Sequence, residues 1–221
     1  MQLPKGFLFD FDGVIVNSFQ SHRSAWESAF KELFHKELPA FPMELAGASP
    51  YKIAEYYAST VGKENQFKDL YFLKDEHLNK FFKVPELLPG IREITFFLKE
   101  NNTPYGIASN ATRQFLKNSI YHLNIDFETY FGVQDYKKPK PAPEAYITLA
   151  NKLGFTVSDF KDIWVFEDSL TGTTAAKLAG MVPIGILTQY SDSELREAGS
   201  QFIFPTVLEA FEYLKTHVTQ K

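Results

Sequence analysis

Four short apolar segments, each followed by a polar turn and a helical pattern, constrain the fold of this chain most strongly. These segments are Gly6–Phe9, Tyr105–Ala108, Ile163–Phe166 and Val182–Leu187. Each is too short for a buried helix, and its continuous apolar character is typical of a strand covered on both faces. The helical patterns between them include Thr112–Leu123, Pro143–Leu153 and Thr171–Ala179. Because strands alternate with helices, we expect an α/β fold with a doubly wound parallel sheet and right-handed crossovers.

The stretch from about residue 17 to residue 85 has no strand pattern. Three apolar stripes with helical spacing run through it: Ala25, Trp26, Ala29, Phe30 and Leu33; Ile53, Tyr56, Tyr57 and Val61; and Leu70, Leu73, Leu78, Phe81 and Phe82. Ser49 and Pro50 suit the N-cap and the first position of the second helix. We therefore predict an all-helical module at residues 17–86, inserted after the first strand into a core of residues 1–16 and 87–221. Both crossings are turn-rich, which suits a hinged lid.

Composition excludes several classes of protein. The 221 residues include 23 Lys and Arg, 27 Asp and Glu, no Cys and 22 Phe, which are best explained by core packing. The lack of cysteine excludes thiolate nucleophiles and thiolate zinc sites, and the net charge of −4 argues against a nucleic-acid partner. The longest apolar run, Leu178–Leu187, is ten residues, whereas a membrane span needs about 20, and the N-terminus does not resemble a signal peptide. We expect a soluble, cytoplasmic protein that is a monomer or a weak homodimer.

The ends of the predicted strands carry the residues with chemical potential, because ligands bind at the carboxyl ends of parallel strands. The first strand is followed by Asp10 and Asp12, whose side chains leave an extended backbone in the same direction, and then by Gly13. The second is followed by Ser109 and Asn110 at the start of a helix, where free N–H groups can bind an anion. Taken singly, the two acids also fit a solvated loop, and Ser109 or Asn110 also fits a helix cap.

Two further segments extend the same edge. In the segment from Lys137 to Glu144, prolines stiffen the backbone around Lys138 and Lys140, so either lysine could be aimed at a fixed point. The strand at 163–166 is followed by Glu167 and Asp168, adjacent acids that require a cation or hydrogen bonds if they are buried. The alternatives are a solvated basic loop and a helix cap.

Together these residues predict a site for a phosphoryl group. Carboxylate oxygens without a Cys or His cluster favour Mg²⁺ over zinc. The metal ion, a lysine and a helix N-terminus would form a cradle for a phosphate. A carboxylate that attacks a phosphate dianion faces like-charge repulsion, which the metal and the lysine would reduce.

The motifs FDFDGVIVNS, IASN, KPAPEAY and FEDSLTG, in this order and with a helical insert after the first, resemble those of the haloacid dehalogenase-like hydrolases. The resemblance covers essentially the whole chain and implies a Rossmann-like core. The helical insert resembles the small cap of β-phosphoglucomutases and phosphoglycolate phosphatases. A second acid at Asp12 implies phosphoryl transfer, because the true dehalogenases of the family lack one there.

The resemblance also implies roles for individual residues. Asp10 would be the nucleophile, and Asp12 the general acid and base as well as a backbone ligand of Mg²⁺. Asp168 would be a metal ligand, together with Asp10, and Glu167 a ligand or a residue that supports one. The phosphoryl oxygens would be held by Ser109, Asn110 and Lys140, which keeps the family's spacing better than Lys138.

The cap residues follow the family less closely. His22 and Trp26 resemble a pair at the cap entrance of β-phosphoglucomutases and are substrate candidates, although His22 could simply extend the packing stripe of Trp26. Those mutases carry a Gly-x-x-Arg whose arginine binds a second phosphate, but here the segment is Gly47–Pro50. Of the residues 17–86, Arg23 is the only arginine, and Lys52 or Lys74 could substitute as point charges.

We therefore expect a Mg²⁺-dependent phosphatase acting on a small phosphorylated metabolite, such as a sugar phosphate or a short acid phosphate. The first alternative is a sugar-phosphate mutase of the β-phosphoglucomutase type. A catalytically silent binding module on this scaffold is the other alternative, and it is disfavoured because every chemical position of the core is filled.

Overall fold

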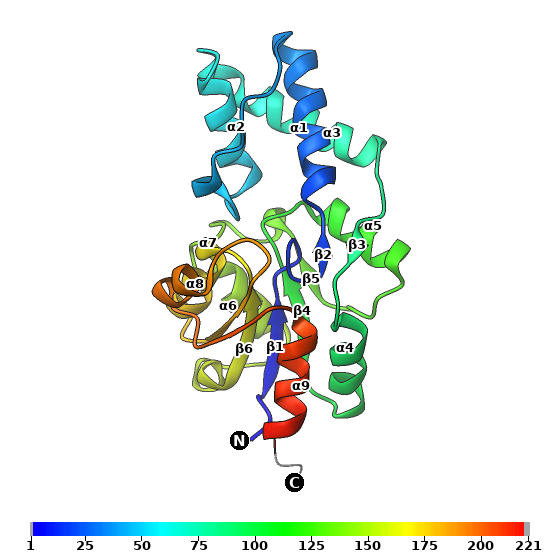
Figure 1. Cartoon of the computed structure of the whole chain (residues 1–221), viewed down its shortest axis with the longest axis vertical. Helices are drawn as coiled ribbons and strands as arrows, with labels where there is room; N and C mark the ends of the chain where they lie inside the picture. The colour runs from blue at the N-terminus through cyan, green and yellow to red at the C-terminus, as the bar shows by residue number, and fades with distance from the viewer. Residues whose placement is uncertain (1, 219–221) are drawn as a thin grey trace.

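A computed structural model, which describes residues 2–218, contains one six-stranded parallel sheet (Figure 1). Its strands, in spatial order, are β5 (Tyr130–Phe131), β4 (Tyr105–Ala108), β1 (Gly6–Phe9), β6 (Ile163–Glu167), β7 (Val182–Ile186) and β8 (Phe202–Phe204). The predicted α/β fold and all four predicted strands are confirmed to within one residue. The sequence pattern did not indicate β5 and β8, because runs of two and three residues are too short to show a period.

Helices cover both faces of the sheet. One face packs against α4 (Ile91–Glu100), α5 (Arg113–Leu123) and α9 (Val207–His217), and the other against α6 (Glu144–Lys152) and α7 (Leu170–Leu178), with α8 (Asp192–Ala198) beside α7. Four 3₁₀ turns complete the described chain: Met43–Leu45, Glu64–Gln66, Val133–Asp135 and Val157–Asp162. The three predicted core helices correspond to α5, α6 and α7.

Alternate residues of the central strands supply two separate apolar layers. Phe7 and Phe9 of β1 join Phe166 of β6 on the face of α4, α5 and α9, whereas Leu8 points to α6 and α7. The rings of Phe9 and Phe166 stack at 4.9 Å between centroids. Much of the phenylalanine content is thus used to fill the larger of these layers.

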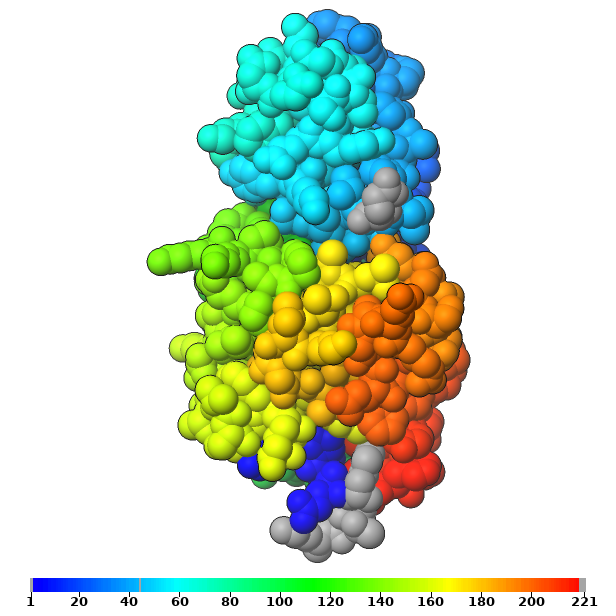
Figure 2. Space-filling view, turned by 90° about the vertical axis from the view of Figure 1, so that its left-hand side faces the viewer, coloured from blue at the N-terminus to red at the C-terminus, as the bar shows by residue number. Residues whose placement is uncertain are grey.

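The inserted segment folds into three helices, α1 (Phe19–Phe34), α2 (Pro50–Ser59) and α3 (Phe67–Lys80), which lie at one end of the molecule in Figure 2. They share a third apolar cluster that includes Trp26, Phe30 and Tyr57 and is distinct from the two layers of the sheet. Pro50 is the first residue of α2, as predicted. The helical prediction was wrong at two helix ends: Phe81 and Phe82 lie beyond α3, which ends at Lys80, and Val61 lies beyond α2, which ends at Ser59. The Phe81 side chain is exposed.

Two short antiparallel strands, β2 (Val16–Asn17) and β3 (Glu86–Leu87), connect the three helices to the sheet. Val16 pairs with Leu87 and Asn17 with Glu86. The predicted boundaries after residues 16 and 86 fall on this pair of strands. The division into a core domain of residues 1–16 and 87–221 and a cap domain of residues 17–86 remains a prediction.

Candidate active site

Asp10 lies at the centre of the site because β1 is flanked by β4 and β6, so its carboxyl end is surrounded by other strand ends. The Asp10 side chain is nearly buried, and its Oδ1 accepts a hydrogen bond of 2.8 Å from Lys140 Nζ. Burial raises the pKa of Asp10 to about 7, although the Lys140 ammonium acts in the opposite direction. The lysine therefore favours the ionised form of a carboxyl group that burial would otherwise keep protonated.

Lys140 is held by three oxygen atoms. Besides Asp10, its Nζ donates to Tyr146 Oη at 2.8 Å and to Glu167 Oε1 at 2.6 Å, and Tyr146 donates to the same Glu167 oxygen. Burial disfavours the charge of Lys140, but the two carboxylates outweigh burial and raise its pKa. Lys138, the competing lysine, is exposed. The structure thus brings Lys140 to Asp10.

The end of β6 supplies Glu167 and Asp168, both buried. Each Glu167 oxygen already has partners, since Oε2 accepts from Ser169 Oγ at 2.9 Å. Asp168 has only Thr188 Oγ1, at 3.0 Å, as a hydrogen-bond partner among residues 2–218. Burial and the neighbouring Asp10 and Glu167 raise the pKa of Asp168 well above its usual range.

These acids fit a hard divalent cation. One carboxylate oxygen from each of Asp10, Glu167 and Asp168 lies within 4.8 Å of the other two. Gly13, with φ of +76°, makes room for the cluster, because a Cβ there would lie 1.9 Å from Asp168 Oδ2. A buried, oxygen-only group with an uncompensated Asp168 suits Mg²⁺. Asp12 lies outside this cluster of side-chain oxygens.

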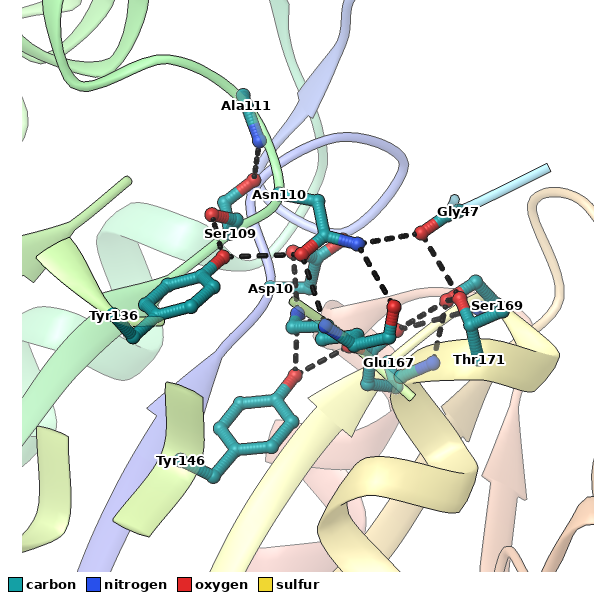
Figure 3. A network of polar contacts seen from close by, with 12 residues as sticks. Asp10, Gly47, Ser109, Asn110, Ala111, Tyr136, Tyr146, Glu167, Ser169 and Thr171 are labelled. Carbon is teal, nitrogen blue, oxygen red and sulfur yellow. Dashed lines mark hydrogen bonds and ion pairs between the residues drawn. The ribbon is translucent and has the colours of Figure 1, made fainter. Parts of the chain in front are cut away.

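Ser109 and Asn110 follow β4, as predicted, and line the same cavity as Asp10. Ser109 Oγ accepts from the N–H of Ala111 at 3.0 Å, which leaves its own proton for a ligand. The amide nitrogen of Asn110 donates to the Gly47 carbonyl at 2.9 Å, and its Oδ1 accepts from the Lys140 N–H at 3.2 Å. Asn110 therefore links the lysine loop to the inserted helical segment (Figure 3).

Asp12 has partners from the helical segment. Its Oδ1 accepts a short hydrogen bond from Ser18 and lies 3.3 Å from His22 Nε2. Burial acts against the charge of Asp12, but His22 and Ser18 outweigh it and lower its pKa.

Lys74 of α3 completes this second chain of contacts. Its Nζ lies 3.0 Å from His22 Nδ1 and 5.4 Å from the ring centre of Trp26. Because an ammonium has only donors, Nδ1 of His22 accepts, and Nε2 carries the proton that is donated to Asp12. Burial lowers the pKa of His22, as does Lys74, and burial lowers the pKa of Lys74 to about 8.

A single cavity of about 760 Å³ joins the acids to the helical segment. All the sequence-predicted site residues except Glu167 line it: Asp10, Asp12, His22, Trp26, Ser109, Asn110, Lys140 and Asp168. Glu167 lies behind this surface and is fully buried. The strand ends and the helical segment therefore form one site.

Gly47 brings the helical segment into direct contact with the core. Its carbonyl oxygen accepts from Asn110 Nδ2 and, at 3.0 Å, from Thr171 Oγ1. A Cβ at Gly47, where φ is +76°, would lie 2.5 Å from Ser169 Cβ. A further bridge runs from Thr112 Oγ1 to Asp75 Oδ1 at 3.0 Å. These contacts hold the helical segment against the core beside the active-site cavity.

With this geometry established, the comparisons identify the family. A family model described as haloacid dehalogenase-like hydrolase matches residues 7–186. The chain belongs to this family.

Relatives of this haloacid dehalogenase-like hydrolase include phosphatases. A phosphorylated carbohydrates phosphatase of Thermotoga maritima is 30% identical over 209 residues, which cover 87% of this chain and 90% of the relative. Glycerol-1-phosphate phosphohydrolase 2 of Saccharomyces cerevisiae is 28% identical, with 89% and 80% covered. The crystal structure of β-phosphoglucomutase from Clostridium difficile superposes with a TM-score of 0.81 at 21% identity, covering 97% of this chain and 96% of that one, which shows the shared fold. The chain is an enzyme of this hydrolase family.

The sequence-based prediction for this hydrolase missed two residues that shape the site. Thr188, which donates to Asp168, follows β7, so the same strand-end rule would have found it. Tyr146 lies six residues after Lys140 on α6, and no local pattern indicates that its hydroxyl contacts both Lys140 and Glu167.

Proposed function

We propose that this haloacid dehalogenase-like enzyme is a Mg²⁺-dependent phosphatase that hydrolyses a small phosphorylated metabolite through an aspartyl-phosphate on Asp10. One observation carries the proposal. A buried carboxylate that is paired with a lysine faces a cavity in which a second acid, Asp12, stands two residues away.

In the first half-reaction, the Asp10 carboxylate attacks phosphorus and the ester P–O bond breaks. The Lys140 ammonium reduces the repulsion between this carboxylate and the phosphate, and Ser109 donates to a phosphoryl oxygen. Glu167 and Tyr146 position Lys140, since both accept hydrogen bonds from its Nζ. A bound Mg²⁺, held by Asp10 and Asp168, would neutralise charge on the phosphoryl group.

Asp12 would transfer the protons. The approach of a phosphate dianion favours protonation of Asp12, because like charges oppose its ionised form. This proton goes to the departing alcohol oxygen. In the second half-reaction, the ionised Asp12 takes a proton from water as the water oxygen attacks phosphorus, and the Asp10–phosphorus bond breaks. The His22 contact favours the ionised form that this step needs.

The cavity supports a hydrolase over a mutase. A mutase of the β-phosphoglucomutase type must hold a second phosphate in the cap, but Pro50 lies in the cavity wall where the arginine would stand. Arg23 is paired with Glu27 at 2.8 Å, and Lys74 is engaged by His22. Lys52 is exposed and lies outside the cavity wall.

The activity can be tested on purified protein with p-nitrophenyl phosphate and a panel of sugar and acid phosphates. We expect phosphate release that requires Mg²⁺ and stops in excess chelator; hydrolysis that persists in chelator would refute the metal's role. β-Glucose 1-phosphate with a bisphosphate primer tests the mutase alternative. Formation of glucose 6-phosphate faster than free phosphate would decide for the mutase.

The proposed partner is a small phosphate ester, and the expectation that the protein binds neither nucleic acid nor a membrane remains a prediction. Among residues 2–218, no helix combines the length and apolarity that a membrane span requires. A cytoplasmic location and a monomeric or weakly dimeric state remain predictions, which fractionation and size-exclusion chromatography test.

A further inference from the structure

The strand ends line one side of the cavity with polar groups, whereas the helical segment contributes a largely apolar surface together with His22, Arg23, Glu27 and Lys74. That second surface, which we call the cap wall, is formed by Trp26, Leu38, Phe41, Pro50, Ile53 and Tyr57. Trp26 and Tyr57 belong to the apolar cluster of the three helices, and Leu38, Phe41 and Ile53 pack against it. The cavity therefore opens onto the apolar interior of the helical segment.

The charged groups on this side of the cavity are already paired. Arg23 donates to Glu27, so this pair presents no net charge to a ligand. Lys74 is almost fully buried, contacts His22 and lies over the ring of Trp26. Glu27 offsets the charge of Arg23, and Lys74 is buried against His22 and Trp26, so neither cation is placed as an unpaired partner for a second anionic group.

Trp26 and Tyr57, two of the three aromatic side chains of the cap wall, also pack against protein neighbours. The Trp26 ring lies 5.6 Å from that of Tyr57, and Tyr57 in turn lies 6.0 Å from Phe30. These rings pack as part of an apolar core rather than as an open platform for a flat polar ring. A polyol bound here would lose hydration of its hydroxyl groups without gaining enough partners, which is costly.

We propose that the cap wall selects phosphate monoesters of alcohols with an aliphatic or aromatic body and no second charged group. This inference rests on the proposed phosphatase activity and narrows its substrate class. The phosphate would lie at Asp10 and Lys140, while the apolar body of the alcohol would replace water along the cap wall. The cavity volume of about 760 Å³ accommodates such a molecule.

A series of alkyl phosphates tests the proposal without changing the protein. Ethyl, butyl and hexyl phosphate present the same phosphate and differ only in buried methylenes. Each methylene transferred to an apolar surface contributes about fourfold, so we expect kcat/KM to rise by that factor per methylene. A flat or falling series, with hydrolysis intact, would overturn the substrate class and leave the phosphatase activity standing.

A matched pair of rings gives the second measurement. Cyclohexylmethyl phosphate and glucose 6-phosphate share a six-membered ring and a CH₂–O–phosphate group, and differ mainly in the ring oxygen and hydroxyls. We expect cyclohexylmethyl phosphate to have a kcat/KM at least about 10²-fold higher, the discrimination that an apolar pocket gives against a hydroxylated analogue. A preference for glucose 6-phosphate would overturn the proposal. If no ester is hydrolysed with Mg²⁺, both the proposed phosphatase activity and the proposed substrate class are refuted.

Substitutions in the cap wall test whether this surface causes the preference for longer alkyl phosphates. Phe41→Ser should lower the ratio of kcat/KM for hexyl over ethyl phosphate by about tenfold. Phe72→Ser is the matched control, because Phe72 is an exposed phenylalanine of the same segment outside the cavity wall. Ile53→Asn serves as a second variant if Phe41→Ser does not fold. An unchanged ratio in a folded cap-wall variant would overturn the assignment of the wall.

Discussion

Asp10 and Asp12 are two residues apart, yet they stand in opposite surroundings. Asp10 is held by Lys140, from the loop before α6 in the core. Asp12 is held by Ser18 and His22 at the start of the helical segment. Burial raises the pKa of Asp10 to about 7, whereas burial of Asp12 is outweighed by His22 and Ser18, and its pKa is lowered.

This difference would separate the two functions proposed for the site. Asp10, the proposed nucleophile, and Lys140 are brought together by the sheet and the loops at its carboxyl edge. Asp12, the proposed proton-transferring residue, depends on the position of α1 and α3, because its partner His22 lies on α1 and contacts Lys74 of α3. Movement of the helical segment would therefore change the surroundings of Asp12 and leave the Asp10–Lys140 pair in place.

The largest effect is expected when the two acids are exchanged for amides. Asp10→Asn should lower turnover by on the order of 10⁴-fold or more, because the attacking oxygen loses its charge. Asp12→Asn should still form a phosphoenzyme from p-nitrophenyl phosphate, whose leaving group needs no proton, but should release phosphate slowly. Acid-quenched, radiolabelled protein measures the phosphoenzyme. Near-normal turnover in folded Asp10→Asn would exclude Asp10 as the nucleophile.

The next largest effect is expected at the lysine of the core. Lys140→Ala should lower kcat/KM by roughly 10²- to 10³-fold, the usual loss when a charge-stabilising donor is removed. Lys138→Ala is the matched control and should stay within about twofold, because Lys138 is exposed. Steady-state kinetics with p-nitrophenyl phosphate compare the two, and the reverse ranking would show that the wrong lysine was chosen.

A smaller effect is expected where the helical segment meets the core. Gly47→Ala should reduce kcat roughly tenfold to a hundredfold, because the added Cβ cannot fit 2.5 Å from Ser169 Cβ and must displace the helices. Phosphoenzyme formation should suffer less than phosphate release, since Asp10 and Lys140 contact each other directly and Gly47 reaches Lys140 only through Asn110. Equal losses in phosphoenzyme formation and in phosphate release would contradict the proposal that Asp10 and Asp12 depend on different parts of the structure. Gly62→Ala, with no neighbour within 4 Å, is the control for the loss of a glycine of positive φ.

The smallest effect on turnover is expected at Lys74, where stability gives the sharper readout. Burial lowers the Lys74 pKa from 10.5 to about 8, so between these pH values the unfolded chain binds more protons than the folded protein. The free energy of unfolding contributed by this group therefore rises with pH from about 8 to 10.5, by on the order of 3 kcal/mol at most.

The gain in free energy of unfolding of Lys74→Met over the wild type should consequently be largest at pH 7. This gain should fall as pH rises from about 8 to 10.5. Chemical denaturation at a series of pH values measures the difference. Lys80→Met on the same helix is the control, because Lys80 is exposed. A stability difference that does not change with pH would show that Lys74 is not buried in its charged form.

Much of the site follows from local pattern. Asp10, Ser109 and Asp168 could be placed together because each follows a short apolar strand, and parallel strands bring their carboxyl ends to one edge. The helical insert was predictable because its three stripes keep one period over some seventy residues. Phe81 was misplaced because periodicity does not show where a helix ends.

The sequence by itself determined the α/β fold, the insertion point of the helices and the acids at the strand ends, since these depend on periodicity and on neighbouring residues. Only the tertiary structure showed that Lys140, which the family's spacing favoured over Lys138, contacts Asp10, that Tyr146 contacts Lys140 and Glu167, and that the cap wall is apolar. Those choices join residues up to 130 positions apart. Loop paths and helix packing fix such contacts, and no local spacing in the chain encodes them.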